Sequence, residues 1–511
     1  MKEFRKCWIT LGLIILLGLS TIPISESEQS TLSSYITTLQ SPTPNQDGNF
    51  GIDIALSGDR LVVGEIRSQI DDISEVGKAY LYDTDWELIA TLTPNTPKTR
   101  ARFGLSVDIK GDILLVSSLD ADVGDILQAG EVQVYDSSGT LLYTLQSNQP
   151  KIKERFGRRL AIGNGIILMG YADVYSDRGT VPVFDMEQNY LTTLQSQSMD
   201  ESLAGEALDA NDEFFFIGGS TLMGSVFVFD YNLGLLTTLQ SPDGKKFTRY
   251  GECIAVSEDH LVVGEPGANL DENNGAGKAY VYDTDWNLLT TLQSPAPEDD
   301  AEFGVDVSIA GDLVVVGEAK GDVTSGDEGK VYVFDLSGNL LDTIVSPEPE
   351  TGAEFGCNVV TDGELLVVSE VYTAVGGLTG AGKIHVFRLG EYEQAVFDIS
   401  NLIINPESVK VGESVTISVD VENLGTISGM YPLKLMINGN MVEEKSVTVD
   451  ESLSEKVIFT YQTETEGSYI VEIGDLSDSF EVKKPVIPGF PVMALVFGLS
   501  LLMIFVTQRK R

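Results

Sequence analysis

"FGVDVSIAGD" at residues 303–312 opens a segment with four short apolar runs, which continue as "LVVVGE" (313–318), "GKVYVFD" (329–335) and "NLLDTIVSP" (339–347). Valine, isoleucine and aromatic residues dominate these runs, and none is long enough for a helix. Short links such as "AGD" and "DLSGN" separate them and have the composition of tight turns. The segment therefore predicts four antiparallel strands.

This four-strand segment occurs seven times along the chain. Each copy begins with Phe-Gly or a variant of it, and the glycines lie 46 to 53 residues apart. Four antiparallel strands in a unit of about 50 residues form a β-propeller blade, and seven is a common number of blades. An open solenoid stack is the alternative. The copies begin at Phe50-Gly51, Phe103-Gly104, Phe156-Gly157, Ala204-Gly205, Tyr250-Gly251, Phe303-Gly304 and Phe355-Gly356.

The two ends of the repeat region distinguish a ring from a stack. The seventh copy stops after "GKIHVFRLG" (382–390), one strand short, whereas an extra fourth strand, "YITTLQSP" (35–42), precedes the first copy. Pairing of 35–42 with Lys383–Arg388 would complete the last sheet and cover its open edge. We therefore expect a seven-bladed β-propeller over residues 31–391, with the N-terminal strand closing the last blade.

The order Phe-Gly, Gly-Asp, Val-Val-Gly and Gly-Lys-x-Tyr-Val resembles the FG-GAP repeats of integrin α-chain propellers, especially the variant of microbial surface proteins. The resemblance covers residues 35–390 and implies cell adhesion or recognition. Integrin-type blades often carry an aspartate-rich calcium loop between their first two strands. Here that link is only "SGD" (57–59), "KGD" (110–112) or "AGD" (310–312). One carboxylate cannot supply the six to eight oxygen ligands of calcium, so these sites are not expected.

A second domain is expected over residues 396–483. In "SVTISVDVEN" (414–423), strict alternation places Val415, Ile417, Val419 and Val421 on one face, and "INGN" (437–440) is typical of a hairpin. This pattern predicts an immunoglobulin-like β-sandwich. It resembles the CARDB-like modules that stand beside membrane anchors in microbial, and especially archaeal, surface proteins. The domain could be a spacer or a second binding module.

Both ends of the chain predict export and anchoring. Residues 1–27 place basic side chains before a short apolar run, as in a signal peptide. Residues 486–507 are apolar and long enough for a transmembrane helix, and the basic residues 508–511 predict a cytoplasmic tail. The "IPGFP" at 487–491 resembles archaeal sorting signals, after which the tail would be replaced by a lipid. Either way, the body of the protein would lie on the extracellular face of the membrane.

Composition limits the possible partners and chemistry. A formal net charge of −44 disfavours a nucleic-acid partner. Cys253 and Cys357 are expected to be buried free thiols, and His260 and His385 to be ordinary strand residues. No catalytic motif or cofactor-binding motif is present, so we expect no catalytic residue and no cofactor. A weak calcium candidate is the acidic loop 267–275, through Asp271 and Asn273, although a solvated loop explains the same residues.

The candidate binding residues lie in three basic segments that lead from a fourth strand into the next first strand. In a propeller these segments share one face with the loops between strands 2 and 3, which are acidic here. The two sets of charges could neutralise each other, contributing roughly 0–1 kcal/mol for each exposed pair. Alternatively, the basic segments form a patch that binds an acidic glycan or a surface protein. The candidates are Lys98, Arg100, Arg102, Lys151, Lys153, Arg155, Arg158, Arg159, Lys245, Lys246 and Arg249.

These observations favour a non-catalytic surface protein that recognises a glycan or a protein partner and is tethered to the membrane through its C-terminus. Two alternatives remain open. One is an extracellular polysaccharide lyase or hydrolase with carboxylates at the mouth of the ring. The other is a structural component of the cell envelope. Fold alone does not distinguish them, because one fold supports many functions.

Overall fold

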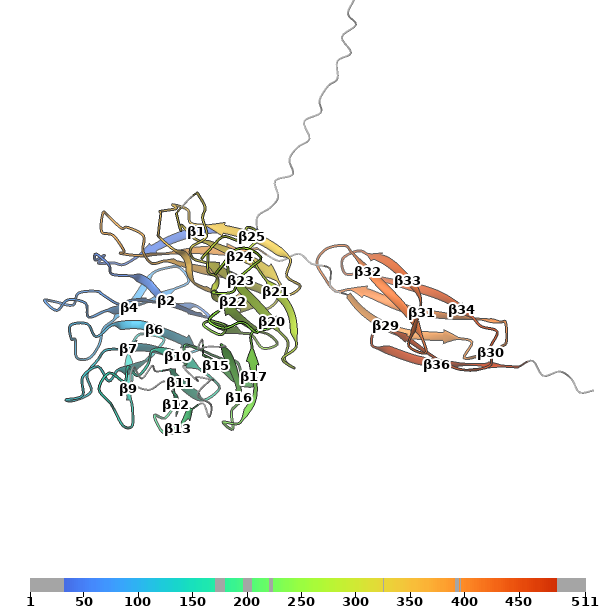
Figure 1. The fold of residues 1–511 in the computed structure, drawn as a ribbon, viewed down its shortest axis with the longest axis horizontal. Helices are drawn as coiled ribbons and strands as arrows, with labels where there is room; N and C mark the ends of the chain where they lie inside the picture. The colour runs from blue at the N-terminus through green and yellow to red at the C-terminus, as the bar shows by residue number, and fades with distance from the viewer. Residues whose placement is uncertain are drawn as a thin grey trace, which may run out of the picture. The chain divides into compact units, whose positions relative to one another are not determined.

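The computed structural model describes residues 32–170, 180–195, 205–219, 224–324, 326–390, 395 and 397–484. All regular structure in these ranges is β-strand, which confirms the all-β prediction (Figure 1). None of these ranges contains a helix long and apolar enough to cross a bilayer. The predicted signal peptide (1–27), transmembrane helix (486–507) and basic tail (508–511) lie outside the described residues. The chain divides into two compact units, Met1–Gly390 and Glu391–Arg511.

The first unit contains seven four-stranded antiparallel sheets. Six of them are built from four strands that follow one another in sequence, joined by short turns such as the Gly58-Asp59 link. Their strands are β2 (Phe50–Ser57), β3 (Arg60–Glu65), β4 (Lys78–Asp83), β5 (Leu88–Leu92); β6 (Phe103–Lys110), β7 (Ile113–Ser118), β8 (Glu131–Asp136), β9 (Leu141–Gln146); β10 (Arg159–Ile162), β11 (Ile166–Gly170), β12 (Thr180–Asp185), β13 (Tyr190–Gln195); β14 (Ala207–Ala210), β15 (Phe214–Gly219), β16 (Ser225–Asp230), β17 (Leu235–Gln240); β18 (Ile254–Val256), β19 (Leu261–Glu265), β20 (Lys278–Tyr282), β21 (Leu288–Leu292); and β22 (Phe303–Ala310), β23 (Leu313–Glu318), β24 (Lys330–Asp335), β25 (Leu340–Val345).

The seventh sheet joins the two ends of the unit. Its order is β1-β28-β27-β26, with β1 (Ser33–Gln40), β26 (Phe355–Thr361), β27 (Leu365–Glu370) and β28 (Lys383–Leu389). β1 runs antiparallel to β28, with Ser33 opposite Leu389 and Gln40 opposite Lys383. This register confirms the predicted pairing of the N-terminal strand with the last copy of the repeat.

The first strands of the seven sheets in the described residues contact one another in the order β2, β6, β10, β14, β18, β22, β26 and back to β2. An open stack would leave β2 and β26 without this contact. The sheets of the first unit therefore form a closed cycle around their first strands.

The Phe-Gly pair at the start of each segment holds neighbouring sheets together. Phe103 is fully buried, and its backbone forms a parallel bridge with Gly77 of the preceding sheet. Gly104 has φ 84°, and a Cβ at this position would lie 2.3 Å from the carbonyl oxygen of Lys78. Only glycine allows this close approach, which explains why the pair recurs.

The second unit consists of two sheets, with the orders β29-β31-β34 and β30-β36-β35-β32-β33. The alternating valines and isoleucine of 414–423 are buried between them, as predicted. β32 and β33 form the expected hairpin at 437–440. The strands are β29 (Phe397–Asn405), β30 (Ser408–Lys410), β31 (Ser414–Asn423), β32 (Gly429–Ile437), β33 (Asn440–Val449), β34 (Ser454–Gln462), β35 (Gly467–Ile473) and β36 (Leu476–Lys483).

Candidate functional site

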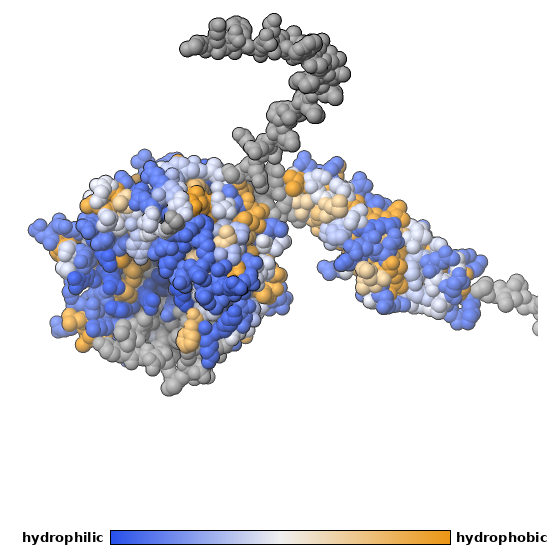
Figure 2. All heavy atoms as spheres, turned by 45° about the horizontal axis from the view of Figure 1, so that its top comes forward, coloured by the Kyte–Doolittle hydropathy of each residue, from blue (hydrophilic) through white to orange (hydrophobic). Residues whose placement is uncertain are grey.

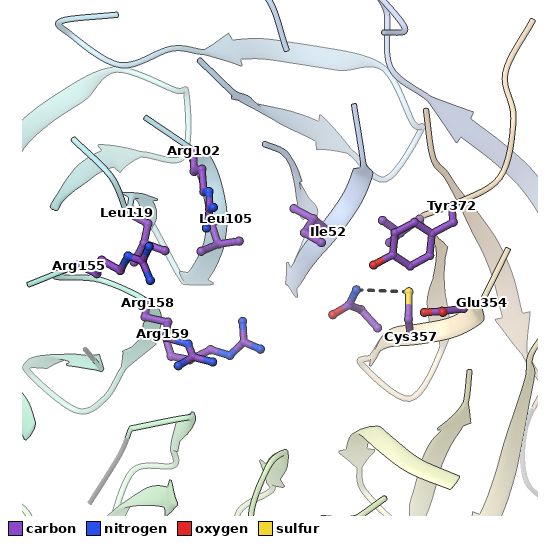
Figure 3. A pocket seen from close by; sticks show the side chains of 12 residues that line it. Ile52, Arg102, Leu105, Leu119, Arg155, Arg158, Arg159, Glu354, Cys357 and Tyr372 are labelled. Atoms are coloured by element: carbon purple, nitrogen blue, oxygen red, sulfur yellow. Dashed lines mark hydrogen bonds between the residues drawn. The ribbon is translucent and has the colours of Figure 1, made fainter. Parts of the chain in front are cut away.

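Four arginines converge on one cavity of about 470 Å³ in the first unit, called the mouth cavity below. Arg102 and Arg155 precede the Phe-Gly pairs of the second and third segments, and Arg158 and Arg159 follow the third pair. Figure 3 shows the arginines on one side of this cavity, with Tyr372, Glu354 and Cys357 facing them from the other. The two sides therefore differ in charge.

The backbone conformation fixes the direction in which the side chains of Arg102 and Arg155 point away from the backbone. Arg102 and Arg155 have φ of 53° and 58°, in the left-handed region that non-glycine residues rarely adopt. The phenylalanine after each is fully buried, and its N–H donates to a carbonyl of the preceding sheet. The same position is occupied by Glu302 and Glu354 in the sixth and seventh segments, also with positive φ. One repeated turn thus presents arginine in the second, third and fifth segments and glutamate in the sixth and seventh.

A single buried carboxylate orients both of these arginines. Asp120 is 5% exposed, with Oδ2 3.1 Å from Nε of Arg102 and Oδ1 3.2 Å from Nε of Arg155. Asp120 lies on the loop between β7 and β8, so the pairing of basic and acidic loops on one face is confirmed here. The pairing positions the arginines but cancels only one of their two charges.

Arg158 and Arg159 add further positive charge. The Nε of Arg159 donates to the backbone carbonyl of Glu206 at 3.0 Å. Burial lowers the pKa of Arg158, and the neighbouring charge of Arg159 lowers it further, yet an arginine stays protonated at neutral pH. Four arginines and one carboxylate, Glu354, thus line the mouth cavity, and further carboxylates such as Asp120 and Glu206 lie behind the arginines. The lining of this cavity is richer in basic than in acidic side chains, unlike the chain as a whole.

Apolar side chains complete the lining of the mouth cavity. Leu105 and Leu119 lie beside the arginines, whereas Ile52 and Tyr372, which is 50% exposed, lie nearer Glu354 and Cys357 (Figure 3). Tyrosine offers a flat apolar face together with a hydroxyl group. A cavity of this kind can hold a ligand that has an acidic group on one side and a C–H-rich face on the other.

A second cavity of about 480 Å³, called the side cavity, adjoins the first. The two share Arg102 and Arg155 as lining residues. The side cavity adds Arg67 and Arg100, and the Nε of Arg100 lies 2.8 Å from Oε2 of Glu75. Arginine is therefore the basic residue of both cavities.

Below the mouth, a channel of about 460 Å³ is lined by the first strands, and it shares Arg159, Cys357 and Asn358 with the mouth cavity. Four half-buried aspartates line the channel, and each accepts a hydrogen bond of 2.7–2.8 Å from a backbone N–H in the next sheet. Burial raises the pKa of three of them, to about 7, 6 and 7 for Asp108, Asp209 and Asp306. The fourth, Asp53, is also raised. These carboxylates connect adjacent sheets.

The structure separates the eleven predicted binding residues into two groups. Arg102, Arg155, Arg158 and Arg159 line the mouth cavity, and Arg100 lines the side cavity. The rest line neither cavity: Lys98 pairs with Asp122, Arg249 pairs with Glu252 and Glu302, and Lys151, Lys153, Lys245 and Lys246 are exposed.

Arg67, Tyr372 and Glu354 were missed from the sequence. Arg67 is a single basic residue in an acidic loop, and Tyr372 and Glu354 belong to the seventh segment, far from the basic segments in sequence. Only the closed cycle brings them near the arginines. A repeat alignment could have found Glu354, because it occupies the position of Arg102 and Arg155.

The other expectations concern single residues. His385 is a buried strand residue, with Nε2 2.8 Å from Oε2 of Glu370 and Nδ1 2.9 Å from Oγ1 of Thr38. Cys253 and Cys357 are free, the first buried and the second half-buried. Asp271 is exposed, and the Nδ2 of Asn273 donates to the carbonyl of Pro297. Within the described ranges, no group of three metal-ligating side chains occurs.

Comparison with known families identifies a repeat that occurs several times in the chain and a domain that occurs once. Residues 86–135, 235–282 and 286–334 match the FG-GAP repeat, and residues 395–474 match CARDB. No curated protein matches the chain. These matches confirm the FG-GAP and CARDB-like resemblances, and both domain types are typical of extracellular adhesion or recognition proteins. Each FG-GAP match begins near an outer strand, such as β21, and ends with the third strand of the next sheet.

Proposed function

We propose that this chain, which contains FG-GAP repeats and a CARDB domain, is a non-catalytic cell-surface protein that recognises an anionic ligand at the mouth cavity. The observation that carries the proposal is the convergence of four arginines on one cavity in a chain of net charge −44. A cluster of arginines in a concave site suits carboxylate or sulfate groups, which the guanidinium fork binds through two hydrogen bonds.

The proposed architecture is a seven-bladed propeller that β1 closes, followed by a CARDB sandwich that acts as a spacer. The closed cycle of first strands and the β1–β28 register support the ring. Residues 486–507 would anchor the protein at the extracellular face of the membrane, either as a helix or through a lipid added after processing. The folded CARDB domain would then separate the first unit from the anchor along the chain.

Recognition fits the mouth cavity better than hydrolysis does. Glycoside hydrolysis needs two carboxyl groups that flank one bond. In the described part of the chain, Glu354 is the single carboxylate among the lining residues, and Asp120 behind them is engaged by Arg102 and Arg155. The cavity can hold an acidic ligand, but it lacks the second carboxylate of that reaction.

Binding to an immobilised polyanion tests this function. Full-length protein should be retained on polygalacturonate at low salt and released as salt is raised, and it should pass through neutral dextran. The double variant Arg158→Glu/Arg159→Glu should lose retention. The matched control Lys245→Glu/Lys246→Glu makes the same charge change on an exposed segment that lines neither cavity, and it should be retained. Equal retention of both variants would refute the mouth cavity as the binding site.

A further inference from the structure

We propose that the mouth cavity and the side cavity form one groove with two acid-binding subsites, and that its ligand is an oligosaccharide with carboxylates on successive sugars. This inference rests on the proposed function and specifies its ligand. The mouth subsite is defined by Arg158 and Arg159, and the side subsite by Arg67 and Arg100. Arg102 and Arg155 lie between them, because they line both cavities.

Each of the two cavities has a volume large enough to hold a sugar unit. Their volumes are similar, about 470 and 480 Å³, and each lies within the range of small-ligand pockets. Because two arginines border both cavities, a ligand in one would extend into the other past the same guanidinium groups. Such a groove accommodates a chain of linked units better than one compact ion.

Four of the six arginines of the groove are held through a single nitrogen. In the described part of the structure, the hydrogen bonds of Arg100, Arg155 and Arg159 all leave from Nε, to Glu75, Asp120 and Glu206 respectively. Arg102 likewise approaches Asp120 through Nε. This arrangement fixes each side chain while the Nη nitrogens remain available. Pre-positioned forks of this kind bind carboxylates at a reduced entropic cost.

Arg249 shows the contrasting case within the same type of segment. Its Nη1 donates to Glu252 and its Nη2 donates to Glu302 at 2.8 Å, so its fork is already occupied by protein carboxylates. It lines neither cavity, and neither do the exposed lysines 245 and 246. Arginines whose Nη nitrogens are not engaged by protein carboxylates therefore occur in the groove, and not wherever the chain is basic.

The wall opposite the arginines favours a sugar over an acidic peptide. Tyr372 is half exposed, and Ile52 and Val371 line the same cavity, so this side offers an apolar surface next to the carboxylate of Glu354. The C–H face of a pyranose ring can pack on such a surface while the ring's carboxylate reaches the arginines across the cavity. In a polyuronate, every sugar unit has both a C–H face and a carboxylate, so neighbouring units can occupy neighbouring subsites.

Calorimetry of full-length protein with galacturonic acid and its dimer, trimer and tetramer tests the two subsites. Affinity should rise at least about ten-fold from the monomer to the dimer or trimer, as expected for one added charged pair. Arg67→Ala/Arg100→Ala should remove this gain, whereas Lys245→Ala/Lys246→Ala, which lie outside both cavities, should keep it. Arg158→Ala/Arg159→Ala should weaken every length. Arg67→Lys/Arg100→Lys keeps the charge but removes the fork, and it too should lose the gain.

The outcomes separate this inference from the proposed function. If the protein is retained on polygalacturonate but binds monomer and trimer equally, the two-subsite groove is wrong and the general function stands. If oligoglutamate binds as tightly as the uronate trimer, the assignment to sugars is wrong. If neither the polymer nor any oligomer binds, both proposals fail. Thermal unfolding of each variant shows whether a loss of binding reflects a loss of fold.

Discussion

Buried glutamates at the ends of the second strands are each matched by a donor on the third strand. Glu65 is fully buried, and its Oε2 accepts from the hydroxyl of Tyr80 at 2.6 Å. Tyr280 and Tyr332 donate in the same way to Glu265 and Glu318 in other sheets, at 2.5 and 2.7 Å. The repeated "Val-Gly-Glu" and "Lys-x-Tyr" motifs are therefore the two halves of one buried hydrogen bond.

Removing the Tyr80 hydroxyl should destabilise the first unit. The Tyr80→Phe variant leaves a buried carboxylate oxygen with fewer donors, and we expect a loss of about 1–3 kcal/mol in the free energy of unfolding. Tyr82→Phe is the matched control, because no described residue forms a hydrogen bond with that hydroxyl, and it should be nearly neutral. Urea denaturation followed by tryptophan fluorescence measures both. An equal loss in the two variants would mean that packing, not the hydrogen bond, is responsible.

The channel aspartates should make stability depend on pH. The pKa of Asp108 is raised to about 7 by burial and by the charge of Asp209. Between its ordinary pKa and about 7, the folded protein binds more protons than the unfolded chain, so stability should fall as pH rises. Asp108→Asn removes this pH-dependent contribution to the free energy of unfolding. The Tm of the variant relative to that of wild type should therefore rise by about 1–2 °C from about pH 5 to about pH 8.

Asp136 provides the control for that pH series. It is half-buried at the end of β8, and hydrogen bonds from Ser138 and Thr140 lower its pKa. Its titration therefore lies below the tested window, and the difference between Asp136→Asn and wild type should stay constant from about pH 5 to about pH 8. A constant difference for Asp108→Asn as well would show that the channel carboxylates do not titrate there.

At the scale of the element, β1 carries the closure of the ring. Ile36 and Leu39 pack against the core shared by the first and seventh sheets, and Ser33 reaches the sixth sheet, where its N–H donates to Oδ2 of Asp342 at 2.8 Å. The FG-GAP matches begin at outer strands, so β1 is the opening strand of the first repeat. Because each repeat starts on one sheet and ends on the next, it links every pair of neighbouring sheets, including the seventh and the first.

Disrupting the apolar face of β1 should open this closure. Ile36→Asp/Leu39→Asp puts two charges against the core, and we expect faster hydrogen exchange along β28 and a lower Tm. Tyr35→Leu/Ile36→Leu copies the sequence of β21 and should keep both near wild type. Exchange over Lys383–Leu389, read by mass spectrometry, distinguishes the variants. Unchanged exchange in the double aspartate variant would mean that β28 does not depend on β1.

The sequence predicted these elements well because their information is local or repeated. The alternation at 414–423 specified a buried face, and the similarity of 35–42 to other outer strands specified its partner. The site was harder to predict, since its geometry depends on contacts between distant segments. Arg102 and Arg249 occupy equivalent positions, yet Asp120 leaves the fork of one free whereas Glu252 and Glu302 occupy the fork of the other. Glu252, three residues after Arg249 where Leu105 follows Arg102, is a local sign of this difference, but Asp120 and Glu302 come from other segments of the chain.

At the scale of the whole molecule, an acidic chain contains a groove that is rich in arginine. Hydrophilic side chains cover most of the first unit's face seen in Figure 2, and the chain carries 77 acidic against 33 basic residues. Such an excess repels itself in the folded state, and salt screens the repulsion. The groove brings six arginines together, and there salt competes with an anionic ligand.

Salt should therefore affect stability and binding in opposite directions. Raising NaCl from about 0.05 M to about 1 M shortens the Debye length to about 3 Å, which should raise the Tm of the first unit and weaken polygalacturonate binding. Trp86 and Trp286 lie in this unit, so tryptophan fluorescence reports its unfolding. Lys245→Glu/Lys246→Glu changes the net charge by −4 outside the groove. The Tm of this variant should rise more steeply with salt, and the salt dependence of its binding should be unchanged. If Tm fell with salt, attractive ion pairs such as those at Asp120 would outweigh the net repulsion, and the groove would be part of a balanced charge network instead of an exception to it.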